Sequence, residues 1–306
     1  MRHAPARMQQ RALGAACGLL ADRAFGEPPA ALHPVAAFGR LMNAVERVGY
    51  APSRAAGVRY TAVGVAVGLA AGGALPTAVV VAGAAAGRAL RLAAVGVRDA
   101  LVASDLERAR ALVPTLVGRD PSDLDASGLA AAVIESLAEN TVDAVVAPVW
   151  WAVAAGPGAA GAYRALNTMD AMVGHRSERY AQFGWASARL DDLANLVPAR
   201  LTALLIAAVR PRARTAIARA LRGQAPAHPS PNAGVAEAAF AGALGVELGG
   251  PVRYGNRHEE RPRLGTGPRP SVRDIDRALA LASHVELALV GVLAVIGVAR
   301  PPRWHR

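Results

Sequence analysis

Three carboxylates in the middle of the chain are spaced so that a helix would place them on one face. Glu135, Glu139 and Asp143 are four residues apart, and positions i, i+4 and i+8 form a single stripe. Like charges this close repel, so they need a cation, arginine partners or a shared proton. We interpret the stripe either as a solvated helix face or as a site that binds magnesium or positions an amine, with Glu139 and Asp143 as catalytic candidates.

A second polar segment begins with Arg164, Asn167 and Asp170. Their spacing of three residues places them on one helix face. The loop that follows contains Arg176 and Arg179, and guanidinium groups bind phosphates and carboxylates through two parallel hydrogen bonds. This combination indicates a region that binds an anionic substrate.

Two adjacent aspartates mark a third segment. Asp191 and Asp192 are followed one helical turn later by Asn195, and together they offer the oxygen donors of a magnesium–phosphate site. Arg189 precedes them and is a further candidate ligand for phosphate. The aspartate pair could instead cap the start of a helix, where carboxylates favour the helix dipole. The sequence leaves both interpretations open.

Two further candidates are isolated in the sequence. His175 lies in the polar loop, and it is either a general base or a histidine with a structural hydrogen bond. Asn232 belongs to the segment 230–234, which precedes an apolar helix and whose free backbone amides could cradle an anion. We therefore count His175 as a catalytic candidate and Asn232 as a substrate-binding candidate.

The elements that must position these groups are apolar helices. Hydrophobic residues make up 53% of the 306 residues and aromatic residues only 4%, and small aliphatic side chains of this kind suit helices packed in a bilayer. Between Arg59 and Arg88, 28 residues in succession carry no charge. As a helix this stretch spans about 42 Å, more than the hydrocarbon layer of about 30 Å. The other candidate spans are 144–163, 278–299, 193–209 and 233–252.

The sequence therefore predicts an all-α, polytopic integral membrane protein with roughly four to five spans. Pro76 is expected to kink the first uncharged stretch or to mark a re-entrant turn. Helical loops on the cytosolic or periplasmic side join the spans, and arginine in many of these loops leaves their orientation open. We expect residues 1–306 to form a single membrane-embedded domain whose motifs are concentrated in 127–235.

Composition excludes several classes of function. All 34 basic residues are arginine, so neither a P-loop lysine nor a Schiff-base lysine is available. The formal net charge of +11 is not accompanied by basic runs interleaved with aromatic residues, so we expect no nucleic-acid partner. The single cysteine, Cys17, excludes an intramolecular disulfide and a cysteine-based zinc site.

Several polar segments, taken in chain order, match the motifs of one known family. They are 22–34, 135–148, Asn167-Thr168-Met169-Asp170, 178–195, 198–202 and Ser230-Pro231-Asn232-Ala233-Gly234. With these motifs the chain resembles the adenosylcobinamide-phosphate synthase family of cobalamin biosynthesis over residues 13 to about 255. It departs from the common pattern at Val235 and Ala236, where tryptophan and proline are frequent, and in having no lysine.

The resemblance implies a multi-pass enzyme of the cell inner membrane. Such an enzyme joins the free propionate of adenosylcobyric acid to (R)-1-aminopropan-2-ol or its O-phosphate in an amide bond. Because a carboxylate and an amine do not condense readily in water, it is an ATP-consuming ligase, in which an acyl phosphate forms and the amine displaces it. The expected partners are these substrates, ATP, the lipid bilayer and other membrane enzymes of the pathway.

On this hypothesis the candidate residues divide into three roles. Magnesium would be held by Asp191, Asp192 and Asn195, phosphate by Arg176, Arg179 and Arg189, and the amine would be oriented or deprotonated by Glu139 or Asp143. The sequence shows no ATP-grasp or P-loop signature, so it does not locate the nucleotide. The alternative from another class is a corrinoid-binding membrane transporter or assembly factor without catalysis.

Overall fold

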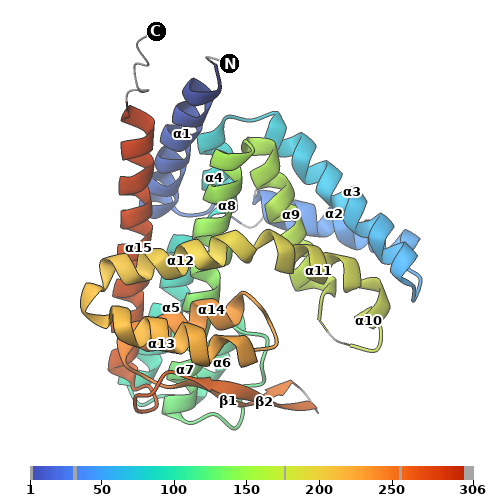
Figure 1. The fold of residues 1–306 in the computed structure, drawn as a ribbon. Helices are drawn as coiled ribbons and strands as arrows, with labels where there is room; N and C mark the ends of the chain where they lie inside the picture. Colours follow the sequence, from blue (N-terminus) through green and yellow to red (C-terminus); the bar gives the residue numbers. More distant parts are fainter. Residues whose placement is uncertain (1–2, 30–32, 176, 255–256, 300–306) are drawn as a thin grey trace. The chain divides into compact units, whose positions relative to one another are not determined.

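The structure is a computed structural model that describes residues 3–29, 33–175, 177–254 and 257–299 (Figure 1). Packing divides the chain into two compact units, each assembled from separate stretches of sequence. Unit 1 comprises Met1–Ala86, Asp143–Asn195 and Leu289–Arg306, and unit 2 comprises Gly87–Val142 and Leu196–Ala288.

Helices are the only regular secondary structure among the described residues of unit 1. Its elements are α1 (His3–Phe25), α2 (Pro34–Gly49), α3 (Arg54–Gly73), α4 (Thr77–Ala84), the π-helical turn η2 (Val142–Val146) from Asp143 onward, α8 (Ala147–Ala154), α9 (Pro157–Val173), α10 (Tyr180–Phe183), α11 (Trp185–Ala194) and the end of α15 (Val272–Val298) from Leu289 onward. The apolar core under α2, α3 and α9 contains Met42, Tyr60, Met169, Val173 and Phe183.

The tightest helix packing in unit 1 joins α3 to α9, which lie side by side in Figure 1. Glycines allow this contact, because a Cβ atom at Gly68 would lie 2.5 Å from the carbonyl oxygen of Gly161. A Cβ atom at Gly72 would likewise lie 2.6 Å from the carbonyl oxygen of Pro157. Small residues that bring helix backbones together are typical of helix pairs in membranes.

Unit 2 is built around one buried helix and carries a small sheet. Its elements are α5 (Gly87–Val102), α6 (Leu106–Leu112), η1 (Val113–Thr115), α7 (Ala126–Thr141), α12 (Leu196–Val209), η3 (Pro211–Ala213), α13 (Arg214–Gly223), η4 (Ala225–Ala227), α14 (Ala233–Leu244), β1 (Leu248–Tyr254), β2 (Arg257–Leu264) and α15 as far as Ala288. Helix α7 begins at the N-cap Asp125, whose side chain accepts from the Gly128 N–H, and it packs against α5 and α14.

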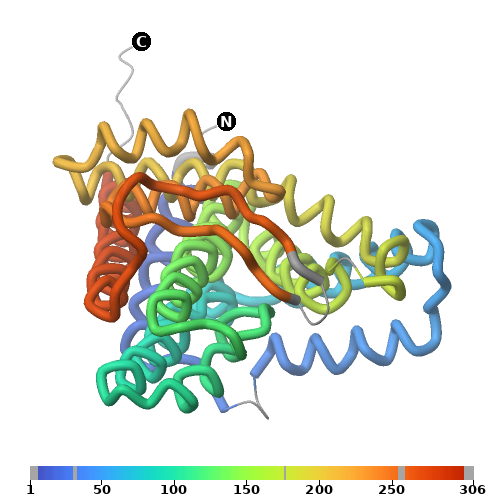
Figure 2. The backbone as a smooth tube through the Cα atoms, turned by 90° about the horizontal axis from the view of Figure 1, so that it is seen from below, coloured from blue at the N-terminus to red at the C-terminus, as the bar shows by residue number. Residues whose placement is uncertain are grey.

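Strands β1 and β2 form an antiparallel pair, seen side by side in Figure 2. Pro251 lies opposite Glu260 and Val252 opposite Glu259, and the register is interrupted between Leu248 and Gly250. Gly249 stands at this bulge with φ of 80°, a left-handed conformation that favours glycine. This sheet is an addition to the otherwise helical architecture.

The prediction of an all-α, polytopic membrane protein is confirmed, but the spans differ in number and place. Among the described residues three helices are long and apolar enough to cross a membrane, or four if α11 and α12 form one broken span. The first stretch, 60–87, overlaps two of them, Arg54–Gly73 and Thr77–Val102, because the chain turns at residues 74–76. The second of these candidates comprises α4 and α5. The third is Val272–Val298.

Two predicted spans are absent from the described structure. The stretch 144–163 is divided between α8 and α9 at Gly156, because the φ of 106° at this residue is incompatible with an α-helix. The stretch 233–252 ends as a helix at Leu244, because Gly245 adopts the left-handed conformation and β1 begins at Leu248. The count among the described residues, three or four with the bent pair, therefore meets the lower end of the expected four to five spans.

Candidate active site

Unit 1 gathers the polar residues of three chain segments at one place. Helix α9 supplies its residues at intervals of three and four, α11 supplies residues from its last turn, and η2 supplies one carboxylate. We call this group the aspartate cluster, which comprises Asp143, Tyr163, Arg164, Asn167, Asp170, Asp191, Asp192 and Asn195.

Asn167 connects the three segments. Its Nδ2 lies 3.2 Å from Asp143 Oδ2 and 3.4 Å from Asp191 Oδ1, so one amide group donates to two carboxylates. Its Oδ1 accepts from Arg164, 3.0 Å away. Every polar atom of this side chain is therefore used to hold charged groups in position.

Asp191 is held from a second side by Asn195. Asn195 Nδ2 donates to Asp191 Oδ2 over 3.0 Å, and its Oδ1 accepts from the hydroxyl of Tyr163 over 2.9 Å. Asp191 is 9% exposed and Asn195 2% exposed. A buried carboxylate fixed by two amides in this way is preorganised, which is what a binding or catalytic site requires.

The place of the aspartate pair in its helix decides one alternative. Asp191 and Asp192 lie in the last turn of α11, which ends at Ala194. Carboxylates at the C-terminal end of a helix are disfavoured by the helix dipole, so the interpretation as an N-terminal cap is wrong. The pair therefore carries a local electrostatic cost at this end of the helix.

The surplus of negative charge in the aspartate cluster acts on Asp170. Burial, followed by repulsion from Asp191 and Asp192, raises the pKa of Asp170 to about 7. Two arginines offset part of this charge, since Arg164 acts on Asp191 and Arg189 lies 3.7 Å from Asp192. A cation that entered here would relieve the repulsion.

The donor set suits a magnesium ion that retains ligands from water or phosphate. Among the residues whose side chains are described, no three His, Cys, Asp or Glu side chains are gathered so as to hold a metal ion. Magnesium is commonly bound by one or two carboxylates and completes its shell with substrate phosphates and water. Asp191 and Asp192 provide such carboxylates, whereas the Asn195 oxygen already accepts from Tyr163.

Other predicted residues of unit 1 lie elsewhere. Arg179 forms an ion pair with Glu46 over 2.8 Å and stacks on Tyr50, with its guanidinium carbon 4.1 Å from the ring centroid. His175 is exposed and packs edge-on against Tyr180, whose hydroxyl also donates to Glu46. The structure therefore joins the loop to α2, and Arg176 lies outside the described residues.

The structure does not place Glu135, Glu139 and Asp143 on the single helix face that their spacing predicts. Glu135 is 2% exposed and pairs with Arg119, and the N–H of Gly249 at the strand bulge donates to it over 2.8 Å. The interpretation as a solvated face is thus wrong for Glu135. Asp143 follows α7 on the π-helical turn, where the i, i+4 spacing no longer applies, and it bonds Asn167 in unit 1.

Glu135 and Glu139 belong to a second polar group, in unit 2. Glu237 on α14 lies 3.7 Å from Nε2 of His228 and 3.8 Å from a guanidinium nitrogen of Arg261. Its carboxyl group also interacts with that of Glu139. We call this group the glutamate cluster, which comprises Arg119, Glu135, Glu139, His228, Glu237 and Arg261.

Asn232 also belongs to unit 2. Its Oδ1 accepts from Arg200 over 2.8 Å. Two of the backbone N–H groups expected to cradle an anion, those of Asn232 and Ala233, lie 3.3 Å and 3.2 Å from the hydroxyl oxygen of Ser230. The segment therefore satisfies its own amides and forms a compact turn before α14.

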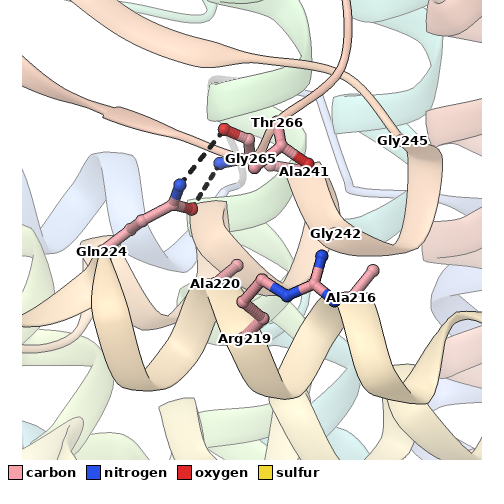
Figure 3. A pocket seen from close by; sticks show the side chains of 9 residues that line it. All are labelled: Ala216, Arg219, Ala220, Gln224, Ala241, Gly242, Gly245, Gly265 and Thr266. Atoms are coloured by element: carbon pink, nitrogen blue, oxygen red, sulfur yellow. Dashed lines mark hydrogen bonds between the residues drawn. The ribbon is translucent and has the colours of Figure 1, made fainter.

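A small pocket of about 30 Å³ lies between α13, α14 and the residues after β2 (Figure 3). Gln224 closes one side, since its side chain donates to the carbonyl of Gly265 over 3.2 Å and accepts from the Gly265 N–H over 2.7 Å. The volume suits about one water molecule. None of the residues singled out in the sequence lines this pocket.

Sequence analysis missed the partners that complete these clusters. Tyr163 closes the apolar stretch 144–163 and gives no pattern of its own, although its hydroxyl fixes Asn195. Glu237 is easier to recognise from the sequence than Tyr163, because it is a lone acid within an apolar segment. His228 lies in the turn before α14 and Arg261 on β2, and only the fold brings them to it.

Comparison with known proteins gives one consistent result. The model of the CobD/Cbib protein family matches residues 15–282. The "Cobalamin biosynthesis protein CobD" of Mycobacterium tuberculosis strain H37Rv is 48% identical over 307 residues, which cover 95% of this chain and 97% of that protein.

Two further proteins of the same name agree. That of Chromobacterium violaceum is 44% identical over 87% of this chain and 90% of its own length. That of Rhodobacter capsulatus is 52% identical over 66% of this chain and 63% of its own length. No solved structure matches. With the family model matching most of its length, the chain belongs to the CobD/Cbib family.

Proposed function

We propose that this protein is an adenosylcobinamide-phosphate synthase. It would join the free propionate of adenosylcobyric acid to (R)-1-aminopropan-2-ol or its O-phosphate in an amide bond, with ATP as co-substrate. The observation that carries the proposal is the aspartate cluster, a preorganised and negatively charged site in a chain whose relatives are named for cobalamin biosynthesis. The proposed location is the cell inner membrane, which the candidate spans support.

The charge of the aspartate cluster matches the demands of the reaction. The amine arrives as an ammonium ion, and ATP is used as its magnesium complex. Both of these reactants therefore bring a positive charge that a surplus of carboxylates can attract. Asp191 and Asp192 would hold magnesium, which supplies charge neutralisation at the phosphates. Asn167 and Asn195 keep Asp191 in place for this task.

The arginines and remaining acids would handle the anionic and amine groups. Arg164, fixed by Asn167, and Arg189, which is largely exposed beside Asp192, would bind phosphate or propionate oxygens. Either Asp143 in unit 1 or Glu139 in unit 2 would orient the amine or act as its base. Arg176, Arg179, His175 and Asn232 stay candidates for substrate contacts without a place in either cluster.

The direct test is a reconstituted reaction. Purified protein in detergent is incubated with adenosylcobyric acid, ATP, magnesium and either aminopropanol or its phosphate, and products are identified by mass spectrometry. The proposal expects a new amide that depends on ATP and forms without a membrane gradient. Comparing the two amines under equal conditions identifies the preferred form.

The same experiment separates the enzyme from the alternative of a corrinoid-binding transporter or assembly factor. A transporter would move substrate across sealed vesicles and leave its mass unchanged. Binding of adenosylcobyric acid without amide formation, in protein that retains its helical circular dichroism, would contradict the proposed synthase. Addition of other membrane enzymes of the pathway would then show whether the chain acts as their assembly partner.

A further inference from the structure

Helix α13 of unit 2 exposes a strongly basic surface. It follows α12 after a short turn and packs against α14 (Figure 1). Six arginines and no acid occur between Asp192 and Glu237, and five of the six lie in residues 210–222. The segment therefore concentrates positive charge that no acid of its own balances.

The packing of α13 determines which of its sides faces outward. Ile217 and Ala220 are buried, and a Cβ atom at Gly242 on α14 would lie 2.8 Å from Cα of Ile217. Backbone contact of this kind holds α13 firmly on α14. The other side of the helix borders an open groove of about 670 Å³, which is lined by Arg214, Thr215, Ala218, Arg219, Arg222 and Gly223.

Two of the five arginines are used to end α12. Arg210 donates from Nη1 to the Val209 carbonyl over 3.1 Å, and Arg214 donates from Nε to the Ala207 carbonyl over 3.0 Å. The last carbonyl groups of a helix have no partner within it, so these contacts satisfy two of them. Both arginines therefore have a structural task.

The other three, Arg212, Arg219 and Arg222, have no such task. Their side chains are exposed and form no ion pair or hydrogen bond with any residue that the structure describes. Each guanidinium group carries five N–H donors in a planar fork, which matches the oxygens of a phosphate group. The surface of α13 is therefore complementary in charge and geometry to ligands that carry phosphate.

A contact within unit 2 relates the start of α13 to the candidate span α15. Nη2 of Arg210 lies 3.1 Å from Nδ1 of His284. Glu286 is the last charged residue of α15, and the residues 287–298 that follow carry no polar side chain. Helix α13 thus begins beside the boundary between the polar and the apolar part of α15, which is the level of the lipid headgroups for a helix that crosses a membrane.

The surroundings of α13 favour lipid phosphates over other polyanions. No aromatic residue occurs between Trp185 and Phe240, so α13 lacks the stacking groups of a nucleic-acid surface. Leu204 on α12 is 68% exposed and Leu287 on α15 is 44% exposed, so the two helices that meet at Arg210 also present apolar surface. Basic side chains beside exposed apolar surface are attracted to anionic membranes.

We propose that Arg212, Arg219 and Arg222 bind the phosphate groups of anionic phospholipids, with the groove on α13 receiving a headgroup. The contact attaches α13, and through it α14, to the membrane surface. It also relieves the repulsion between arginines that are close together on one helix. Lipid binding on α13 is independent of amide synthesis, so either can fail without the other.

The direct test is lipid binding by the full-length protein. Native mass spectrometry in a neutral detergent counts the lipids retained as phosphatidylglycerol or, separately, phosphatidylcholine is added. We expect the wild type to bind phosphatidylglycerol at least about tenfold more tightly, because only this lipid has a headgroup with net negative charge. Equal affinity for the two lipids would overturn the proposal.

Two double variants locate the binding. Arg219→Gln with Arg222→Gln, the α13 variant, should bind phosphatidylglycerol about ten- to thirtyfold more weakly than the wild type. Arg108→Gln with Arg273→Gln is the matched control, since both side chains are exposed in unit 2 and also lack partners in the part of the chain that the structure describes. The control should stay within about threefold of the wild type, because salt screens charges remote from the lipid. Equal losses in both variants would assign the attraction to net charge and would contradict a site on α13.

Stability and activity separate the remaining outcomes. Lipid nanodiscs that contain phosphatidylglycerol should raise the melting temperature of the wild type above its value in pure phosphatidylcholine, and the α13 variant should lose this rise. If the α13 variant does not fold, the single substitution Arg222→Gln and the comparison of the two lipids on the wild type decide. Absence of amide synthesis with selective lipid binding intact would contradict the proposed function alone.

Discussion

Asn195 donates from Nδ2 to Asp191 Oδ2 over 3.0 Å, and the two residues are one turn apart at the end of α11. The contact fixes a carboxylate at the helix end where the dipole opposes it. Because Asn195 accepts from Tyr163 at the same time, a residue on α9 determines how the acid on α11 is oriented. The cluster is therefore held together by neutral groups that bind charged ones.

Tyr163→Phe tests this support. The substitution removes the buried hydroxyl and leaves Asn195 Oδ1 without its donor, so the free energy of unfolding should fall by about 1–3 kcal/mol. Thermal unfolding in detergent measures the loss. Tyr50→Phe removes an exposed hydroxyl that donates to the Arg179 carbonyl, and it should cost less than half as much. Equal losses in both variants would show that the Tyr163 hydroxyl is not a structural link.

Asp192→Ala tests the candidate magnesium ligands. Asp192 is partly exposed and lies 3.7 Å from Arg189, so its removal should leave the folded protein intact. Amide formation should fall at least a hundredfold, because a ligand to the metal–phosphate complex is lost. Asp123→Ala, which removes a 75% exposed carboxylate, should retain wild-type turnover. Substantial activity in purified Asp192→Ala would remove this residue from the site.

Asp170 makes stability depend on pH. Its pKa rises from about 3.9 in the unfolded chain to about 7 in the folded protein, so the folded state binds the proton more tightly. The free energy of unfolding should therefore fall as pH rises from about 4 to about 7 and change no further from this cause above it. Asp170→Asn has no carboxyl group at this position, so its free energy of unfolding should not show this fall with rising pH.

Melting temperatures of wild type and Asp170→Asn, compared at pH 5 and pH 8 in EDTA, measure the effect. The melting temperature of Asp170→Asn minus that of the wild type should be larger at pH 8 than at pH 5. Magnesium added at pH 8 should raise the melting temperature of the wild type, since a cation offsets the same repulsion. A difference between the two proteins that is the same at both pH values would contradict the raised pKa.

Gly68→Ala and Gly73→Ala form a matched pair on α3. At Gly68 the new methyl group meets the Gly161 carbonyl oxygen at 2.5 Å, so α3 and α9 must separate and the protein should be destabilised by about 1–3 kcal/mol. At Gly73 nothing lies within 4 Å, and alanine should be neutral or stabilising by up to about 1 kcal/mol. Equal effects at both positions would contradict the close contact.

The sequence revealed those parts of the site that depend on local spacing. Arg164, Asn167 and Asp170 share a face of α9 as their intervals predict, and the apolar runs identified a helical membrane protein. The stripe of Glu135, Glu139 and Asp143 failed because a π-helical turn changes the period at Val142, and no residue type announces such a turn.

What sequence reasoning could not supply was tertiary pairing. Arg179 and Glu46 are 133 positions apart and come together only because the loop before α10 packs on α2. Glu237 was visible as an acid in an apolar segment, but its neighbours His228 and Arg261 come from a turn and a strand that no periodicity connects. Gly249 is a further case, since its N–H reaches Glu135 only through the strand bulge.

The contact of α3 with α9 limits how unit 1 can change shape during turnover. The two helices contact each other through backbone atoms, which cannot adjust by changing side-chain rotamers. They should therefore move together as one rigid body. Tyr163 and Asn167 lie on α9 and therefore move with this rigid body. Any opening or closing around Asp191 must consequently arise from displacement of α11 or of the turn bearing Asp143, and labels placed there would register it.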